Sequence, residues 1–90
     1  MSNENTVITV IILGHELVFH PTETAYNQFL NEAARKPNVM GVLREYIQKI
    51  IAPESREDLK EIIRRPGVAG KLVELVNDEY APDIEAFIKR

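Results

Sequence analysis

Two short runs of apolar residues open the chain, and a glycine separates them. Residues 6–13 are rich in β-branched side chains, residues 16–20 are mostly apolar, and Gly14-His15 stands between the two runs. β-Branched residues favour strands, and a two-residue break that begins with glycine is typical of a type II′ hairpin turn. The pattern therefore predicts an antiparallel hairpin in which Ile12 lies opposite Leu17.

Alternation along these two strands predicts one fully apolar face and one mixed face. The apolar face, expected to pack on helices, holds Ile8, Val10, Ile12, Leu17 and Phe19. The mixed face holds Val7, Thr9, Ile11, Leu13, Glu16, Val18 and His20. A two-stranded hairpin has two unpaired outer edges and is marginally stable alone. Either a helix or another chain is therefore expected to cover the mixed face.

Apolar residues then recur at helical spacing, and a proline stands at every break between the periodic segments. The predicted helices span residues 23–35, 39–51, 56–64, 67–80 and, as a last short segment, 83–89. The expected fold class is α+β, with an N-terminal two-stranded antiparallel hairpin followed by four or five short helices. Residues 1–5 are expected to form a flexible N-terminal tail and residues 6–90 a single α+β domain.

Capping residues support the predicted helix boundaries. Thr22 and Asn38 stand where N-caps are expected, before the first and second helices. Ser55 with Asp58 three residues later resembles a capping box in which Asp takes the place of Glu. Gly70 is expected to let the fourth helix approach a neighbour closely.

Charge is unevenly distributed along the 90 residues, which carry a formal net charge of −3. Residues 1–34 hold four acids and no Lys or Arg, residues 35–66 hold eight bases and five acids, and residues 67–90 hold three bases and five acids. A dedicated nucleic-acid-binding protein usually has a stronger, one-sided basic excess. The apolar run at residues 7–13 is far shorter than the roughly 20 residues of a membrane helix, so no membrane association is expected.

The residue types that carry catalysis or bind metals are sparse. The chain has no cysteine, which excludes disulfides and thiolate metal sites. His15 and His20 lie at opposite ends of one predicted strand, so a shared metal is not expected, and neither Ser2 nor Ser55 lies in a nucleophile motif. We therefore expect no enzyme activity, no cofactor and no metal site.

The segment 64–71 contains Gly67-Val-Ala-Gly70 flanked by bases. A Gly-x-x-Gly loop clamps RNA in KH domains, but those domains need a third strand that this sequence does not predict. A helix break followed by close packing is therefore the favoured interpretation. The alternative function is a small nucleic-acid-binding regulator that uses the basic 35–65 region, through Arg35, Lys36, Arg44, Lys49, Arg64 and Arg65.

The chain has more apolar surface than one small core needs, and surplus apolar surface marks interaction sites. The candidate partner or self-association surface is Val7, Ile11, Leu13 and Val18 on the hairpin together with Ile84, Phe87 and Ile88 near the C-terminus. Packing within the chain is the alternative for both groups. The open hairpin edge is also suited to pair with the same edge of another copy, which would give a homo-oligomer.

Two parts of the sequence resemble small phage tail assembly chaperones. The opening resemblance runs over Ile8–Phe19 and continues through Pro21-Thr22, Tyr26-Asn27 and Leu30-Asn31-Glu32. The closing resemblance lies in Pro66-Gly67-Val-Ala-Gly and in Asn77-Asp-Glu-Tyr80-Ala-Pro-Asp83-Ile84. Residues 35–60 match in character only.

The resemblance implies a non-catalytic protein of a tailed phage or prophage. Such chaperones bind the tape-measure protein in the cytoplasm of the bacterial host before tail-tube polymerisation, and they are absent from the mature virion. Some are accompanied by a longer frameshifted form. The resemblance implies no catalytic residues. The sequence itself predicts no cofactor and no membrane association, and its charge distribution disfavours nucleic acid as a partner.

Overall fold

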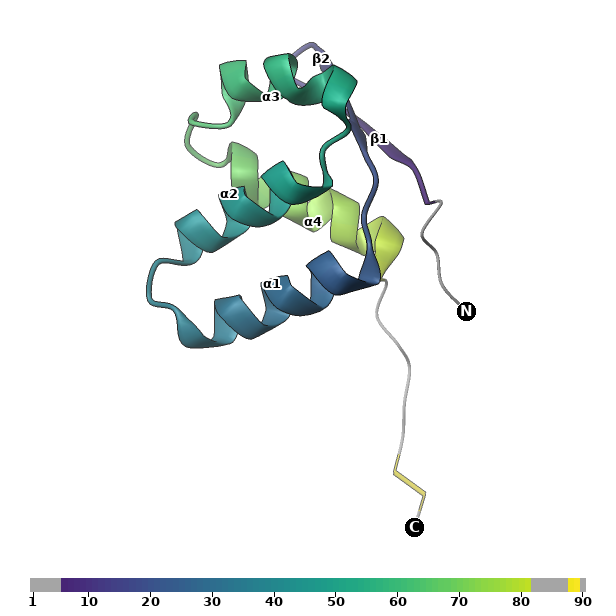
Figure 1. Ribbon diagram of the computed structural model, residues 1–90, viewed down its shortest axis with the longest axis vertical. Coiled ribbons are helices and arrows are strands. Elements are labelled where there is room, and N and C mark those ends of the chain that lie inside the picture. The colour runs from purple at the N-terminus through teal and green to yellow at the C-terminus, as the bar shows by residue number, and fades with distance from the viewer. Residues whose placement is uncertain (1–5, 82–87, 90) are drawn as a thin grey trace.

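The computed structural model describes residues 6–81 and 88–89, and it shows a hairpin followed by helices (Figure 1). The elements are β1 (Ile8–Ile12), β2 (His15–Phe19), α1 (Glu23–Arg35), α2 (Val39–Ile50), a short 3-10 helix η1 (Pro53–Ser55), α3 (Arg56–Ile62) and α4 (Val68–Tyr80). The predicted α+β fold class is confirmed, with four α-helices within the described residues. The predicted tail at 1–5 and most of the predicted helix at 83–89 lie outside those residues.

The hairpin turn differs from the predicted one. The two turn residues are Leu13 and Gly14, both with positive φ (52° and 80°), and His15 belongs to β2 opposite Ile12. The predicted turn at Gly14-His15 is therefore wrong. Because the pairing moves by two residues, every side chain keeps its predicted face. The observed register pairs Ile8 with Phe19, whereas the predicted one would place a proline, which lacks an N–H, at that position.

The apolar hairpin face forms the core with the helices, as predicted. Its four buried members are Ile8, Val10, Leu17 and Phe19, while Ile12 is partly buried against the same cluster. α4 packs on β1, α3 packs on β2, and α2 lies against both α1 and α4. Several fully buried side chains therefore come from segments distant in sequence, among them Tyr46, Ile47, Leu72 and Val76.

The outer edge of β2 is occupied, which corrects the expectation that both hairpin edges are unpaired. The chain just after α2 runs beside β2, where the His20 N–H donates to the Ile50 carbonyl (2.7 Å) and the Ala52 N–H donates to the Val18 carbonyl (2.8 Å). The Val18 N–H donates to Ser55 Oγ (3.0 Å). Ser55 thus makes no side-chain cap of α3, and the predicted capping box is wrong.

The other predicted caps are confirmed. Thr22 Oγ1 accepts from the Ala25 N–H (3.1 Å), and Asn38 Oδ1 accepts from the Gly41 N–H (3.0 Å). Each bond satisfies a backbone donor that the first turn of a helix leaves free. These local bonds explain why α1 and α2 begin where the sequence predicts.

The two glycines around the start of α4 have different roles. Gly67 is the N-cap of α4 with φ +87°, in the left-handed region that side chains with a Cβ rarely adopt. A Cβ on Gly70 would meet no described atom within 4 Å. The predicted close approach at Gly70 is therefore wrong, and the requirement for glycine lies at Gly67.

These roles predict opposite effects of alanine. Gly67→Ala is expected to lower the free energy of unfolding by about 1–2 kcal/mol, because Ala resists the left-handed conformation. Gly70→Ala, inside the first turn of α4, is expected to leave stability unchanged or raise it by up to about 1 kcal/mol. Urea unfolding followed by circular dichroism measures both. Equal destabilisation by the two variants would contradict this assignment.

The burial of Tyr46 predicts that the protein loses stability at alkaline pH. Burial, followed by the charges of Tyr80 and Tyr26, raises the pKa of Tyr46 above its ordinary range of about 10. The unfolded chain therefore releases this proton first, so the stabilisation is complete below about pH 10 and falls as the pH rises further.

The matched variant is Tyr46→Phe, which removes both the titration and the hydrogen bond that Tyr46 Oη donates to Asn77 Oδ1 (2.9 Å). At neutral pH the variant is expected to be less stable by about 1 kcal/mol. The difference in unfolding free energy between the wild-type chain and Tyr46→Phe should then shrink between pH 10 and pH 11. A constant difference over that range would show that Tyr46 titrates normally.

Candidate functional site

The solvent face of the hairpin carries an apolar strip, here called the hairpin strip and defined as Val7, Ile11, Leu13 and Val18. Val7 is 55% exposed, Ile11 74% and Leu13 52%, while Val18 is half-buried. Ile11 lies in the middle of β1 between inward-facing Val10 and Ile12, so strand alternation forces it outward. Ile11 and Val18 thus present apolar side chains from the strands, while Val7 and Leu13 extend the strip just before β1 and into the turn.

The backbone edge beside the hairpin strip is also unpaired. Backbone hydrogen bonds alternate in an antiparallel pair, and Val18 directs its N–H and C=O outward on β2. Thr9 lies opposite Val18, so its N–H and C=O point outward on β1. Ile11 is two residues further along the strand, and its backbone groups point outward as well. No other described strand pairs with that edge. A partner strand would thus find both donors and acceptors there.

The candidate residues near the C-terminus have a different status. Ile84 and Phe87 lie outside the described residues, and Ile88 is 80% exposed. The structure thus brings together the hairpin half of the predicted surface, and whether either half binds a partner stays a prediction.

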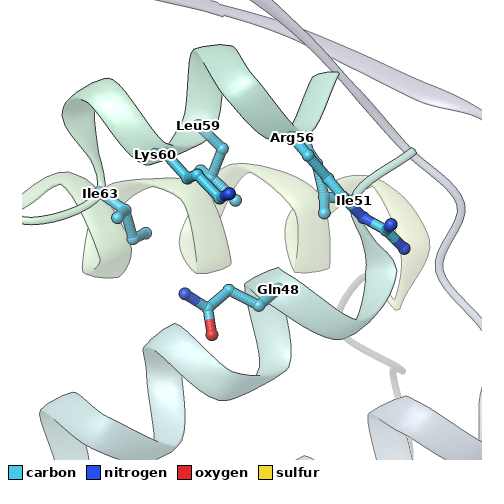
Figure 2. Close-up of a pocket in the computed structure, with 6 residues that line it drawn as sticks. All are labelled: Gln48, Ile51, Arg56, Leu59, Lys60 and Ile63. Atoms are coloured by element: carbon cyan, nitrogen blue, oxygen red, sulfur yellow. The ribbon is translucent and has the colours of Figure 1, made fainter. Parts of the chain in front are cut away.

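A cleft lies between α2 and α3 (Figure 2). One cavity of about 200 Å³ is lined by Gln48, Ile51, Arg56, Leu59, Lys60 and Ile63. A second cavity of about 330 Å³ is lined by Arg44, Gln48, Ile63 and Arg64. The two cavities share Gln48 and Ile63 and therefore lie next to each other. The sequence analysis noted some of these bases but not the cleft, since it depends on how α2 and α3 are placed.

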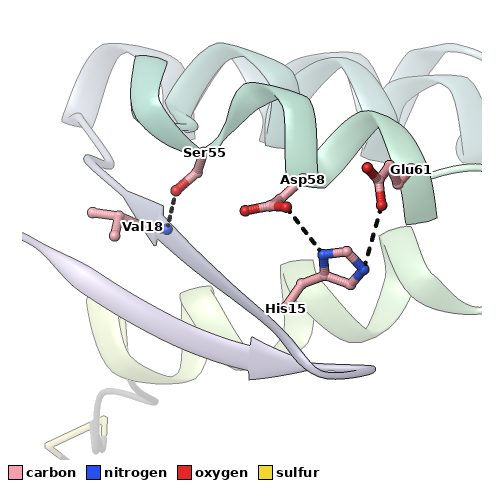
Figure 3. A network of polar contacts seen from close by, with 5 residues as sticks. All are labelled: His15, Val18, Ser55, Asp58 and Glu61. Atoms are coloured by element: carbon pink, nitrogen blue, oxygen red, sulfur yellow. Dashed lines mark hydrogen bonds and ion pairs between the residues drawn. The ribbon is translucent and has the colours of Figure 1, made fainter.

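A polar network joins the hairpin tip to α3 (Figure 3). His15 Nδ1 lies 3.2 Å from Asp58 Oδ1, and His15 Nε2 lies 3.8 Å from Glu61 Oε2. The two carboxylates are three residues apart and so share one side of α3. Sequence reasoning missed this cluster because His15 and Asp58 are 43 residues apart. The sequence features that could have indicated this cluster are the acidic pair Asp58 and Glu61, three residues apart on one predicted helix, and a histidine in the predicted turn.

The same three residues have the donor types of a cation site. Their ligand atoms all lie within 4.8 Å of one another, and zinc accepts imidazole nitrogen and carboxylate oxygen. The carboxylates, however, face opposite ring nitrogens of His15. The network therefore fastens the hairpin tip to α3 through a hydrogen bond between His15 and Asp58 and a longer contact between His15 and Glu61.

Comparison with known proteins gives one match. The family model described as phage tail assembly chaperone matches residues 8–90. Neither a curated protein nor a solved structure matches the chain. A chaperone description implies a non-enzymatic role. Among the described residues, no helix has the length and apolar character needed to cross a bilayer.

The His15 network predicts a measurable contribution to stability. His15→Ala is expected to lower the free energy of unfolding by about 1 kcal/mol or less, because the contacts are only partly buried. His20→Ala is the matched control, since His20 is exposed at the far end of β2. A double-mutant cycle with Asp58→Asn should give a positive coupling energy. Zero coupling would mean that the two side chains do not interact in solution.

Proposed function

The chain belongs to the phage tail assembly chaperone family, and on this basis we propose that it binds the tape-measure protein of a tailed phage or prophage before tail-tube polymerisation. In this proposal it acts without catalysis in the cytoplasm of the bacterial host and does not remain in the mature virion. A longer frameshifted form, where the phage makes one, would be a further partner. The family match over residues 8–90 and the exposed hairpin strip support the proposal.

The hairpin strip is the observation that carries the proposal. A chaperone that holds an aggregation-prone segment needs apolar contact that is easily reversed. Complete burial of one Val, Leu or Ile side chain contributes about 1.5–3 kcal/mol. Val7, Ile11 and Leu13 are 55%, 74% and 52% exposed, so covering what remains of the three would contribute roughly 3–5 kcal/mol, against an association cost of about 4–15 kcal/mol. One strip alone binds weakly, which suits transient holding and favours the use of several copies.

Self-association uses the same part of the molecule. The free edge of β1 can add a strand from a second copy, because its outward backbone groups are unpaired and β1 carries no charged residue or proline of the kind that protects edges. An antiparallel pairing centred on Thr9 would place Val7 of one copy opposite Ile11 of the other. Such pairing would join two hairpin strips into one apolar surface.

Substitution of Ile11 tests the role of the hairpin strip. Ile11→Asp is expected to leave the fold intact, because the side chain is exposed, and to weaken retention of co-expressed tape-measure protein in the soluble fraction by tenfold or more. The same variant should lower the molar mass measured by light scattering if copies pair through β1. Val39→Asp is the control, because Val39 is also exposed and Asp is favourable in the first turn of α2.

The possible outcomes distinguish a specific client surface from unspecific apolar contact. Loss of retention with Ile11→Asp but not with Val39→Asp supports the hairpin strip as the client surface. If both retention and molar mass are unchanged in Ile11→Asp, the strip is not an interface. If Val39→Asp has the same effect as Ile11→Asp, any exposed apolar residue suffices and no specific surface exists.

A further inference from the structure

We propose that the cleft between α2 and α3 is a second interaction surface, which takes an acidic amphipathic helix of a partner protein. This surface is distinct from the hairpin strip, and the proposal stands whether or not that strip binds a tape-measure protein. It depends on three properties of the cleft, namely its apolar floor, its basic rim and the spacing of its charges.

The floor is apolar and comes from the core. Ile51, Leu59 and Ile63 line the cavity of about 200 Å³ while remaining almost fully buried, at 5%, 3% and 5% exposure. Pockets for small molecules usually measure about 300–1,000 Å³. A cavity below that range is better suited to one apolar side chain that projects from a docked segment than to a free ligand.

The rim is basic. Arg44, Arg56, Lys60 and Arg64 line the two cavities, and no acidic residue is among the described residues that line them. Lys60 has a partner in Glu57 at 3.6 Å, whereas no ion pair involves Arg44, Arg56 or Arg64 within the described residues. These four positive charges stand out in a chain whose net charge is −3. The complementary partner therefore carries carboxylates.

The spacing of these charges matches a helix. Arg56 and Lys60 are one helical turn apart on α3, and Arg44 and Gln48 are one turn apart on α2. Side chains at i and i+4 of a partner helix are about 5–6 Å apart at their Cβ atoms. A helix laid along the cleft can thus direct an i, i+4 pair of Glu side chains to Arg56 and Lys60. Arginine is also the residue best suited to bind a carboxylate through two parallel hydrogen bonds.

Two of these bases, Arg44 and Arg64, also belong to the alternative nucleic-acid-binding region, but the cleft favours a polypeptide. Proteins that bind single strands combine a basic groove with aromatic side chains on which bases stack. No residue described as lining either cavity is aromatic. Phosphates would leave the floor of Ile51, Leu59 and Ile63 without an apolar partner. An acidic amphipathic helix can place apolar side chains against the floor and carboxylates against the basic rim.

The test is a nuclear magnetic resonance titration of the full-length chain with a synthetic peptide. The probe is a helix of about four turns with Leu along one face and Glu at i, i+4 positions beside it; a second peptide has every Glu replaced by Lys. We expect the acidic peptide to shift the amide signals of Gln48, Leu59 and Ile63 and the Lys peptide to leave them unchanged. Shifts confined to the hairpin strip, or equal shifts with both peptides, overturn the proposal.

Charge reversal locates the contact. Arg44→Glu/Arg56→Glu is expected to weaken binding of the acidic peptide by at least tenfold. Arg65→Glu/Lys71→Glu makes the same change in net charge at residues that line neither cavity, and is expected to weaken binding by less than threefold. If the first pair prevents folding, as judged by circular dichroism, Arg44→Gln/Arg56→Gln replaces it with the same expectation. Equal effects of the cleft and control pairs overturn the proposal.

Two further measurements exclude other occupants. A 20-base-pair DNA duplex is titrated under the same conditions; tighter binding of the duplex than of the peptide at the cleft, with a steep dependence on salt, overturns the proposal in favour of nucleic acid. The free protein is also diluted without peptide. If the cleft signals shift with protein concentration, a second copy is the occupant and the proposal is likewise overturned.

Discussion

The structure depends on a hairpin that carries apolar side chains on both faces, in a chain whose described helices cover one of them. Ile8, Val10, Leu17 and Phe19 are buried against the helices, and Ile11 on the opposite face remains exposed. A domain of this size buries a modest fraction of its surface, so the helices that close the core cannot also wrap the hairpin. The exposed face is therefore a consequence of how the described chain distributes its apolar residues.

The two hairpin edges differ in the same way as its two faces: the chain covers one of them and leaves the other exposed. The outward groups of Val18 on β2 are satisfied by the Ala52 N–H and the Ser55 hydroxyl, and the His20 N–H donates to the Ile50 carbonyl. The cost of this arrangement is the cap of α3, because a hydroxyl group accepting from Val18 does not serve the first turn of the helix. Closing β2 from within the chain leaves β1 as the exposed edge, and β1 is the strand that carries Ile11. The unpaired backbone and the unpaired apolar face thus coincide.

How far the sequence predicts this structure depends on the range of the interaction. Alternation identified the buried hairpin face, and the caps at Thr22 and Asn38 are formed within one helical turn, so the starts of α1 and α2 follow from local residues. The turn was misplaced because local turn chemistry competed with long-range pairing: Leu13 adopts positive φ so that Ile8 can face Phe19. The Ser55 contact and the His15 network join residues 37 and 43 positions apart, and the cleft depends on how the consecutive helices α2 and α3 are placed in space. Gly67 is a different case: the sequence places it at the start of the fourth helix, but its left-handed backbone is visible only in the structure.

α3 connects these observations. It has only seven residues, and yet its charges are segregated by side. Asp58 and Glu61 face the histidine at the hairpin tip, Arg56 and Lys60 line the cleft, and Leu59 lies in the core and also forms part of the cleft floor. A helix this short is too small to be stable on its own, so its position depends on the contacts on each side. His15 contacts the acidic side of α3, and Leu59 and Ile62 anchor the helix in the core. The contact that fastens the hairpin tip is therefore one of the contacts that position the helix lining the cleft.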